Sequence, residues 1–248
     1  MGVLDGKTAL VTGGSSGLGA YFARLLAGEG AKVAVAARRL HRLEKLASEV
    51  PGITPIRMDV TNVDSIKDGV TAAEKELGGI SILINNSGVA NSNAALNVEE
   101  EEWDAVLDTN LRGAWLVAKA VAERMIHGGD GGSILNTASV LAFKVQKGTM
   151  PYGVSKAGLV QLTRMLAAEW ARYGIRVNAI APGYIETDMN RSYLQSNEGQ
   201  AMLRAIPQRR FGKADDLAGV VLLLASDASA YITGVLIPVD GGHTVMLA

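Results

Sequence analysis

The chain has 248 residues, enough for one large α/β domain with a full core or for two small domains. Hydrophobic residues make up 48% of the chain and the mean hydropathy is +0.17, which indicates a globular protein and excludes a disordered one. A net charge of −1 gives no support to nucleic-acid binding. The longest apolar run, residues 217–225, has about half the length needed to span a bilayer.

The residue types present also limit metal and disulfide chemistry. The chain has no cysteine, which excludes disulfides and cysteine metal sites and fits a reducing compartment. His41, His127 and His243 are far apart and show no metal-ligand spacing, so each is predicted to be a surface side chain. No signal-peptide or myristoylation pattern opens the sequence. We therefore expect a cytoplasmic protein with no metal site, no membrane partner and no nucleic-acid partner.

The first part of the chain contains a glycine-rich stretch at residues 12–19. Residues 7–11 before it read as a buried strand, and the apolar residues after it recur at helical spacing. A strand that turns through glycines into a helix directs backbone N–H groups and the positive end of the helix dipole at one point, where a phosphate binds. Gly13 would allow the tight exit, Gly17 the approach of a pyrophosphate and Gly19 close packing of the helix. The alternative is a glycine-rich turn with no ligand.

Strand patterns and helix patterns alternate along the rest of the chain. The further predicted strands are residues 32–37, 53–58, 80–84, 133–138, 175–180 and 234–239. The predicted helices are residues 40–50, a segment capped by Thr61 or Asn62 and ending near 77, 99–126, 152–173 and 215–225.

This alternation predicts a Rossmann-type α/β fold, a doubly wound parallel sheet of about seven strands with helices on both faces. No change in composition marks a second domain, so residues 1–248 are predicted to form a single nucleotide-binding domain. In such sheets ligands bind beyond the carboxyl ends of the strands. The residues that follow each strand are therefore the candidate site.

The end of the second strand indicates which dinucleotide is preferred. A carboxylate there would bind the adenosine ribose, but this chain has Ala37 followed by Arg38 and Arg39. A guanidinium can hold a 2′-phosphate by two hydrogen bonds. We therefore predict NADP(H) over NAD(H); the alternative is two solvated arginines at a helix start.

A second candidate group combines Ser139, Tyr152 and Lys156. Tyr152 and Lys156 lie four residues apart on a predicted helix and so project from one face. A tyrosine hydroxyl has an ordinary pKa of about 10, and a nearby ammonium favours its phenolate form. Ser139, at the end of the fifth strand, could hydrogen-bond a substrate oxygen. By itself, a tyrosine–lysine pair at this spacing more often has a structural role than a catalytic one.

Six motifs in register resemble the short-chain dehydrogenase/reductase family, in the single-domain branch with the Tyr-x-x-x-Lys motif. They cover essentially the whole chain: Thr12-Gly13-x-x-x-Gly17-x-Gly19, Asn85-Asn86-Ser87-Gly88, Asn110, Ser139, Tyr152-x-x-x-Lys156 and Asn178-x-x-x-Pro182-Gly183.

The resemblance implies a role for each matching residue. Tyr152 would be the general acid/base, Lys156 would lower its pKa and bind the nicotinamide ribose, Ser139 would polarise the carbonyl, and Asn110, in the fourth helix, would support a proton-relaying water. Further cofactor contacts would come from Ser15, Ser16, Leu18, Asp59, Val60, Asn86, Ser87, Gly88, Pro182, Gly183, Ile185 and Thr187. The implied reaction is hydride transfer between NADP(H) and a carbonyl or secondary alcohol.

Substrate choice is predicted to lie in two segments, residues 140–145 beside Ser139 and a lid at about residues 184–212. The candidate substrate contacts are Ser139, Leu141, Tyr152, Tyr184, Met189 and Tyr193. The apolar content of these segments favours a partly hydrophobic ketone or aldehyde.

Three questions of function and assembly follow from the resemblance. Family members that reduce 3-oxoacyl-carrier-protein tend to have basic residues near the ends of helices four and five, where this chain has residues 129–131 and Tyr173 beside Arg172. A small-molecule carbonyl reductase or a polyol or sugar dehydrogenase is therefore favoured over the carrier-protein reductase. A non-catalytic NADP(H) sensor is the alternative from another class. Apolar residues on more than one face of helices four and five predict a homotetramer, or a homodimer.

Overall fold

In the computed structural model, which describes residues 2–187 and 190–246, the strands form one parallel sheet of seven. Its order is β3-β2-β1-β4-β5-β6-β7, and every neighbouring pair is parallel. The strands are β1 (Thr8–Thr12), β2 (Lys32–Ala37), β3 (Ile53–Arg57), β4 (Ile82–Asn85), β5 (Gly132–Thr137), β6 (Ile175–Pro182) and β7 (Leu236–Val239). The predicted Rossmann-type fold class is confirmed.

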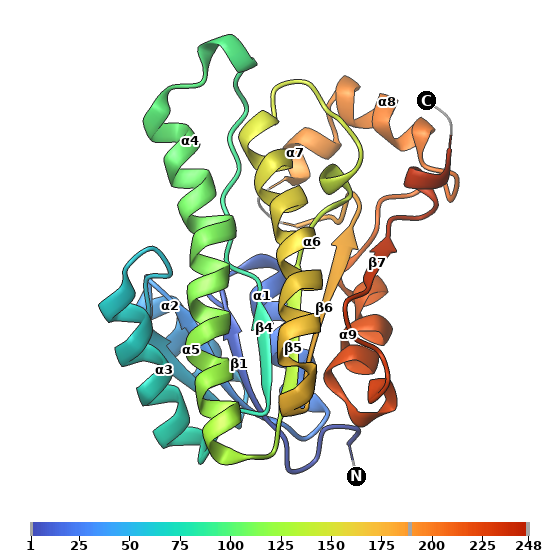
Figure 1. The fold of residues 1–248 in the computed structure, drawn as a ribbon. Helices are drawn as coiled ribbons and strands as arrows, with labels where there is room; N and C mark the ends of the chain where they lie inside the picture. Colours follow the sequence, from blue (N-terminus) through green and yellow to red (C-terminus); the bar gives the residue numbers. More distant parts are fainter. Residues whose placement is uncertain (1, 188–189, 247–248) are drawn as a thin grey trace.

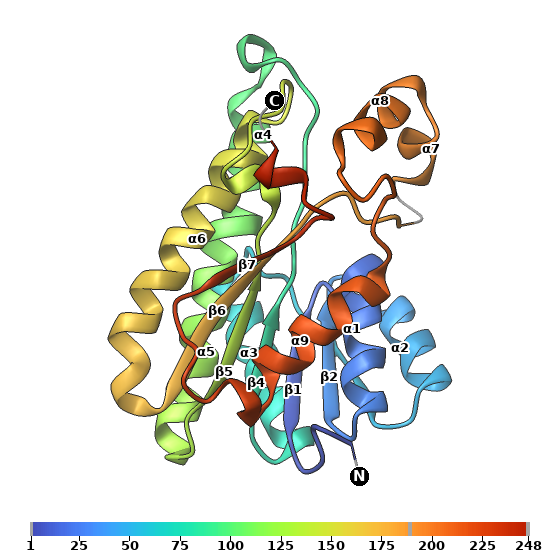
Figure 2. The same ribbon diagram turned by 90° about the vertical axis from the view of Figure 1, so that its right-hand side faces the viewer.

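Helices cover both faces of this sheet (Figures 1 and 2). The helices are α1 (Gly17–Gly28), α2 (Leu40–Glu49), α3 (Val63–Leu77), α4 (Glu100–Leu107), α5 (Gly113–Gly128), α6 (Met150–Trp170), α7 (Arg191–Leu194), α8 (Asn197–Ala205) and α9 (Ala218–Ala225). One buried cluster joins α3, α5 and α6 to the sheet, and a second joins α1, α2 and α9 to its other face. Among the described residues, no helix has both the length and the hydrophobicity that crossing a bilayer requires.

Local chemistry explains where α3 begins and ends. Asn62, one of the two predicted caps, accepts a hydrogen bond from the Ser65 backbone N–H through Oδ1 at 2.8 Å. Gly78 ends the helix with φ +79°, a conformation that costs glycine little. The predicted cap at Asn62 and the predicted end near residue 77 are therefore confirmed.

The predicted helix over residues 99–126 is wrong as a continuous α-helix. A π-helical turn, Asp108–Arg112, separates α4 from α5, and the Gly113 N–H bonds the Asp108 carbonyl five residues back. A β-carbon at Gly113 would lie 2.6 Å from the Val60 carbonyl oxygen, so the helix passes very close to the chain that leaves β3. Asn110 lies in the π turn, and its side chain bonds both the loop after β4 and α6.

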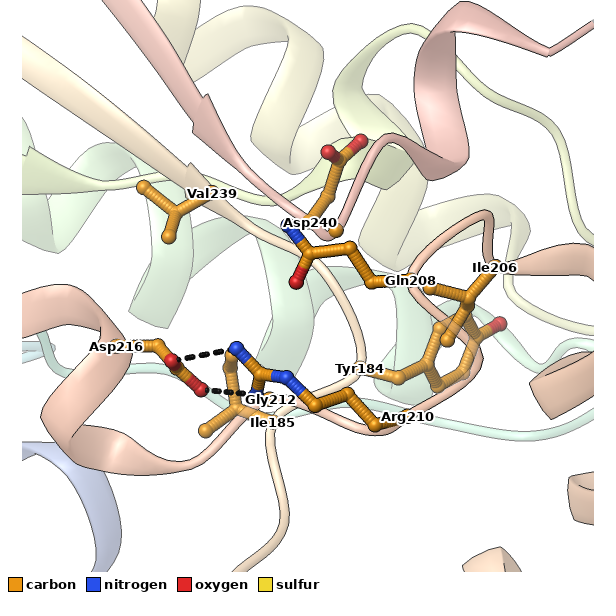
Figure 3. Close-up of a pocket in the computed structure, with 10 residues that line it drawn as sticks. Tyr184, Ile185, Ile206, Gln208, Arg210, Gly212, Asp216, Val239 and Asp240 are labelled. Carbon is orange, nitrogen blue, oxygen red and sulfur yellow. Dashed lines mark hydrogen bonds and ion pairs between the residues drawn. The ribbon is translucent and has the colours of Figure 1, made fainter.

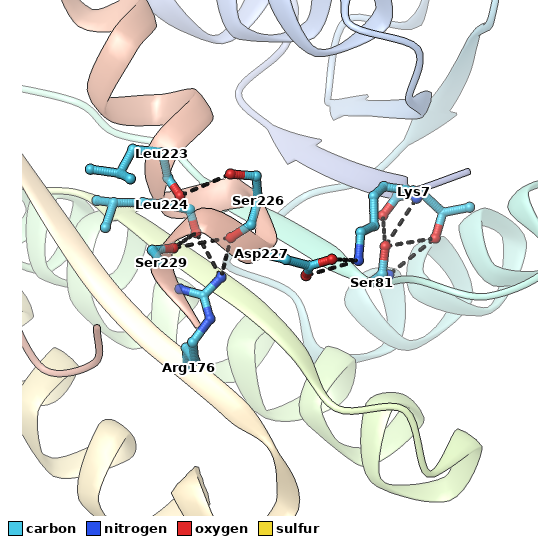
Figure 4. A network of polar contacts seen from close by, with 9 residues as sticks. Lys7, Ser81, Arg176, Leu223, Leu224, Ser226, Asp227 and Ser229 are labelled. Atoms are coloured by element: carbon cyan, nitrogen blue, oxygen red, sulfur yellow. Dashed lines mark hydrogen bonds and ion pairs between the residues drawn. The ribbon is translucent and has the colours of Figure 1, made fainter. Parts of the chain in front are cut away.

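Polar contacts close the edge of the sheet where the strands begin (Figure 4). Arg176 of β6 donates to the carbonyl oxygens of Leu224 at 3.0 Å and Ser226 at 3.1 Å, at the end of α9. Lys7, just before β1, forms an ion pair with Asp227 at 3.0 Å. These contacts fix α9 to the amino-terminal edge and leave the opposite edge to the candidate site.

Candidate active site

Two loops at the carboxyl edge are tied together by Thr12, the last residue of β1. Its hydroxyl oxygen accepts hydrogen bonds from the backbone N–H groups of Asn86 at 3.0 Å and Ser87 at 3.1 Å. The Asn86 side chain in turn donates to the Thr12 carbonyl at 3.2 Å. The glycine loop after β1 and residues 86–88 after β4 are thus held side by side, as the order of the strands requires.

The glycines of the first loop form a cradle. Gly13 has φ +68° and Gly17 has φ +55°, and a β-carbon at Gly17 would meet no protein atom within 4 Å. A β-carbon at Gly19 would lie 2.3 Å from the Gly13 carbonyl oxygen, so α1 can start this close to the loop only without a side chain there. Ser15, Ser16 and Leu18 complete this strand–loop–helix turn. Open space beside backbone N–H groups at a helix start suits a phosphate.

The two arginines after β2 have different contacts. The Arg39 guanidinium donates to the Ser15 hydroxyl at 3.0 Å and to the Ser16 hydroxyl at 3.4 Å, so its charge lies on the glycine loop. Arg38 faces Asp59. Burial alone would raise the pKa of Asp59, but hydrogen bonds from Thr61 and the nearby Arg38 charge together lower it. Both arginine side chains are exposed, so a phosphate group arriving from solvent can reach them.

These residues fit a phosphorylated dinucleotide. The cradle offers space at Gly17 and hydrogen-bond donors at the start of α1, and Arg39 brings a guanidinium to the same loop. Val60 is 8% exposed, and the Asp59 carboxylate accepts two hydrogen bonds from Thr61. Their contacts with the cofactor stay predictions.

Ser139, Tyr152 and Lys156 come together at the end of β5 and the start of α6. The Lys156 ammonium lies 5.6 Å from the centre of the Tyr152 ring and donates to the Thr137 carbonyl at 2.7 Å. Ser139 lies close enough to the Tyr152 hydroxyl to lower its pKa. A β-carbon at Gly88 would lie 3.6 Å from the Lys156 nitrogen, so the loop after β4 borders the same group.

Burial is the largest cause of the pKa shifts of both Tyr152 and Lys156. Burial raises the pKa of Tyr152, and the hydrogen bond from Ser139 offsets only part of that rise. The pKa of Lys156 falls to about 8 because its nitrogen is fully enclosed. That Lys156 lowers the pKa of Tyr152 stays a prediction, because the shift seen at Tyr152 comes from burial and from Ser139.

Asn110 links the π turn to α6. Its side-chain carbonyl accepts from the Val89 N–H at 2.8 Å, and its amide donates to the Val89 carbonyl at 2.8 Å and to the Ser155 hydroxyl at 3.0 Å. The Ser155 hydroxyl donates a hydrogen bond to the Tyr152 carbonyl at 2.7 Å. The amide is completely buried, so it fixes the backbone around Tyr152. Sequence reasoning missed Ser155 and Thr137, whose contacts depend on the fold.

The chain after β6 packs against β7. The Gly183 N–H donates to the Val239 carbonyl at 2.9 Å, directly after Pro182. Ile185 forms an isolated bridge with Gly212, which closes residues 184–212 at their base. The Thr187 N–H donates to the Asn190 side chain at 2.8 Å.

Hydrogen bonds place two of the predicted substrate contacts, Leu141 and Tyr184. Leu141 donates its N–H to the Ser139 hydroxyl at 3.2 Å, and the Tyr184 hydroxyl donates to Gln146 at 2.8 Å. Met189 lies outside the described residues, and the structure describes the backbone but not the side chain of Tyr193.

A cavity of about 200 Å³ lies at the base of the predicted lid (Figure 3). Arg210 crosses it to pair with both oxygens of Asp216, at 2.6 and 2.8 Å, and this pairing lowers the pKa of Asp216 to about 2. Its lining residues are Tyr184, Ile185, Ile206, Gln208, Arg210, Gly212, Asp216, Val239, Asp240 and Gly241. Because Ser139 and Tyr152 are not among them, the cavity adjoins the candidate catalytic group without containing it.

The prediction for the histidines is right for two of the three. His41 and His127 are exposed, whereas His243 is half-buried against Tyr184, with ring centres 5.7 Å apart. Sequence spacing could not place His243 there, because the contact joins the end of β6 to a turn about 60 residues later. Within the described residues, no group of three acidic or histidine side chains could hold a metal ion.

A family model described as enoyl-(acyl carrier protein) reductase matches residues 13–244. A solved short-chain type dehydrogenase/reductase from Mycobacterium marinum is 40% identical, covers 98% of this chain and 97% of its own, and superposes with a TM-score of 0.92. The chain is a short-chain dehydrogenase/reductase. It is therefore an NAD(P)-dependent oxidoreductase that acts on CH–OH groups.

Two other relatives of this dehydrogenase/reductase bear on substrate and cofactor. The 3-oxoacyl-acyl-carrier-protein reductase FabG of Thermotoga maritima is 40% identical over 246 residues, covering 98% of this chain and 99% of the relative. A gluconate 5-dehydrogenase from Burkholderia cenocepacia, solved with NADP and tartrate, is 34% identical with a TM-score of 0.93, covering 98% of this chain and 97% of its own.

Proposed function

We propose that this short-chain dehydrogenase/reductase interconverts a carbonyl and a secondary alcohol with NADP(H), using Tyr152 as the general acid/base. The observation that carries the proposal is the meeting of Ser139, Tyr152 and Lys156 beside the glycine cradle. NADP(H), when bound, supplies or accepts the hydride. The chain itself has to hold the substrate oxygen and move its proton.

Ser139 and Tyr152 have distinct tasks. Ser139 lies beside the Tyr152 hydroxyl, and both would bond the substrate oxygen, which Ser139 orients. Tyr152 gives its proton to that oxygen in reduction and takes it back in oxidation. Its raised pKa keeps the phenol protonated at neutral pH, which favours proton donation and hence reduction. Alcohol oxidation needs the phenolate and therefore increases with pH.

Preference for NADP(H) over NAD(H) is supported by Arg39. Its guanidinium rests on Ser15 and Ser16 of the cradle, where it can hold a 2′-phosphate. The Arg38 charge acts on the Asp59 carboxylate and lowers its pKa. The gluconate 5-dehydrogenase relative was solved with NADP.

A small-molecule ketone, aldehyde, polyol or sugar is the substrate class that the polar residues beside Ser139 support best. Gln146 and Tyr184 bring an amide and a phenol to this side of the site. The second candidate is a 3-oxoacyl-carrier-protein substrate, favoured by the 40% identity to FabG. The absence of a basic cluster after α5 and α6 does not decide against it, because both helices end at the edge of the sheet where β5 and β6 begin.

The experiment is an NADPH-oxidation assay with diketones, ketoacids, keto sugars and a 3-oxoacyl thioester, and the reverse assay with polyols. Turnover of the small molecules, faster than of the thioester, supports the proposal. A thioester preference supports the second candidate. No turnover across the panel, with NADPH still bound, would favour the non-catalytic sensor.

Two further parts of the proposal concern shape and assembly. Residues 184–212, including α7 and α8, would act as the substrate lid of a single domain spanning residues 1–248. A homotetramer or homodimer is supported by apolar side chains that stand in solvent on α5 and α6, among them Trp115 at 42% and Met165 at 52% exposed. Sedimentation of a stable, active monomer would refute the assembly.

A further inference from the structure

The loop between Ser139 and Tyr152 carries a polar side chain that reaches the chain after β6. The Tyr184 hydroxyl donates to Gln146 Oε1 at 2.8 Å. The Gln146 carbonyl accepts from the Thr149 hydroxyl at 3.0 Å, three residues before Tyr152. Since Oε1 is engaged by Tyr184, the same amide offers Nε2 as a donor. Gln146 and Tyr184 therefore form a fixed polar pair on a loop that begins and ends at residues of the catalytic group.

A turn near the carboxyl end of the chain brings a third polar side chain to this pair. The Asp240 carboxylate accepts from the N–H groups of Gly242 at 2.9 Å and Thr244 at 2.8 Å, so both oxygens hold the turn. The His243 N–H donates to the Asp240 carbonyl at 3.2 Å. The turn packs the His243 ring against Tyr184, with the ring planes inclined at 54°.

The carboxyl-terminal segment is also fixed to the substrate loop itself. The Lys144 ammonium donates to the Met246 carbonyl at 2.9 Å, across 102 residues of sequence. Lys144 lies two residues before Gln146. The position of His243 is thus set from two sides, by the Asp240 turn and by the loop that follows Ser139.

One atom of this arrangement has no partner. Within the described part of the chain, His243 Nδ1 is buried and makes no hydrogen bond. A buried polar atom without a partner costs about 1–3 kcal/mol, and most such atoms in proteins are paired. This unpaired atom belongs to the ring that packs on Tyr184, whose hydroxyl bonds Gln146 on the loop that starts at Ser139. Because Nδ1 has almost no surface exposed to solvent, a hydroxyl group of a bound molecule would pair it after a small rotation of the ring.

We propose that His243, with Gln146 and Tyr184, binds a hydroxyl group of the substrate other than the one that reacts. This inference rests on the proposed function and narrows its substrate class to polyhydroxylated molecules, such as alditols and sugar acids. A site that is built to hydrogen-bond a hydroxyl rejects an analogue that lacks it, because its own polar groups then stay unpaired. An alkyl ketone or an acyl chain would leave Nδ1 in that state.

The test compares alditols of four to six carbons with 2-alkanols of the same length, both oxidised with NADP⁺. The variant is His243→Phe, which retains a ring against Tyr184 and removes the nitrogen. We expect kcat/KM for the alditols to fall about 10- to 100-fold, with the 2-alkanol values within about threefold of the original. His243→Asn, whose amide can replace Nδ1, should recover most of the alditol activity. His127→Phe, at an exposed histidine, is the matched control and should change neither value.

The outcomes separate this inference from the function on which it rests. If His243→Phe lowers both substrate classes equally, or neither, the hydroxyl-binding role is wrong while the reaction stands. A change of oligomeric state with an unchanged alditol-to-alkanol ratio also contradicts it, because His243 then serves an interface. If the original protein oxidises neither class and reduces no carbonyl, the proposed function fails first and this inference with it.

Discussion

The side chains that position Tyr152 and the side chain that packs on Tyr184 differ in their hydrogen bonds. Around Tyr152, the Lys156 nitrogen, the Asn110 amide and the Ser155 hydroxyl all bond to backbone or to one another. Beside Tyr184, His243 Nδ1 is buried without a partner in the described part of the chain. Groups that serve the same reaction for every substrate can be locked in place. Groups that select a substrate need a bond that only the substrate completes.

The largest expected effect comes from Lys156→Met, which removes the buried charge from the catalytic group. We expect turnover to fall about 10³-fold, because Tyr152 loses its neighbouring ammonium. Stability should change in the opposite direction. The depressed pKa of Lys156 corresponds to a burial cost of about 3 kcal/mol, and replacing a buried charge by an apolar side chain often stabilises a protein. After the loss of the bond to Thr137, we expect a net gain of about 1–2 kcal/mol at pH 7.

Urea unfolding as a function of pH checks the sign of this effect. The folded pKa of about 8 lies below the ordinary value of 10.5, so below pH 8 the lysine is charged in both states and the folded state bears the full cost. The cost decreases as the pH rises from 8 to about 10.5, and the original protein should gain stability over that range. Lys156→Met should lack this gain, and the exposed Lys147→Met should keep it. A Lys156→Met variant that is less stable than the original protein and has normal turnover would contradict both expectations.

A smaller effect is expected from Arg39→Asp, which alters the cofactor side and leaves the catalytic group unchanged. Losing the guanidinium on Ser15 and Ser16 should lower kcat/KM with NADPH by about 10- to 100-fold and leave the value with NADH unchanged or higher. Arg38→Asp, beside Asp59, should act in the same direction. The exposed Arg42→Asp on α2 is the control. An unchanged ratio of NADPH to NADH in both variants would refute the assigned preference.

The smallest effect tests whether Asn110 holds the catalytic group together. Asn110→Ala removes three hydrogen bonds and leaves the Val89 carbonyl and N–H without their partners. We expect a loss of about 1–3 kcal/mol in the free energy of unfolding, or roughly 2–10 °C in Tm for a chain of this size. The exposed Asn97→Ala should change Tm by less than about 1 °C. Equal Tm values for the two variants would show that the amide does not support the site.

The sequence predicts local features of this molecule well and contacts between distant segments poorly. Gly13 and Gly17 do adopt positive φ, and Asn62 does cap α3, because each depends on its neighbours in the chain. The π turn at Asn110 is invisible in the sequence, because it arises where α5 passes the Val60 carbonyl.

The titration of Tyr152 and the position of His243 also required the fold. Four-residue spacing correctly places Tyr152 and Lys156 on one face of α6, but it gives no account of how deeply both groups are buried. His243 reaches Tyr184 through a turn held by Asp240, a contact that no spacing in the sequence indicates. The pairing of Tyr152 with Lys156 was therefore predictable from the sequence, and the position of His243 beside Tyr184 was not.

The measurement that tests the central claim most directly is turnover of Tyr152→Phe with a substrate from the activity panel, together with NADPH binding by fluorescence titration. The substitution removes one hydroxyl and keeps the ring under Lys156. The account predicts a loss in kcat of about 10³-fold or more, with the Kd for NADPH within about threefold of the original, whereas the exposed Tyr173→Phe stays fully active. Turnover of Tyr152→Phe within tenfold of the original protein would contradict it.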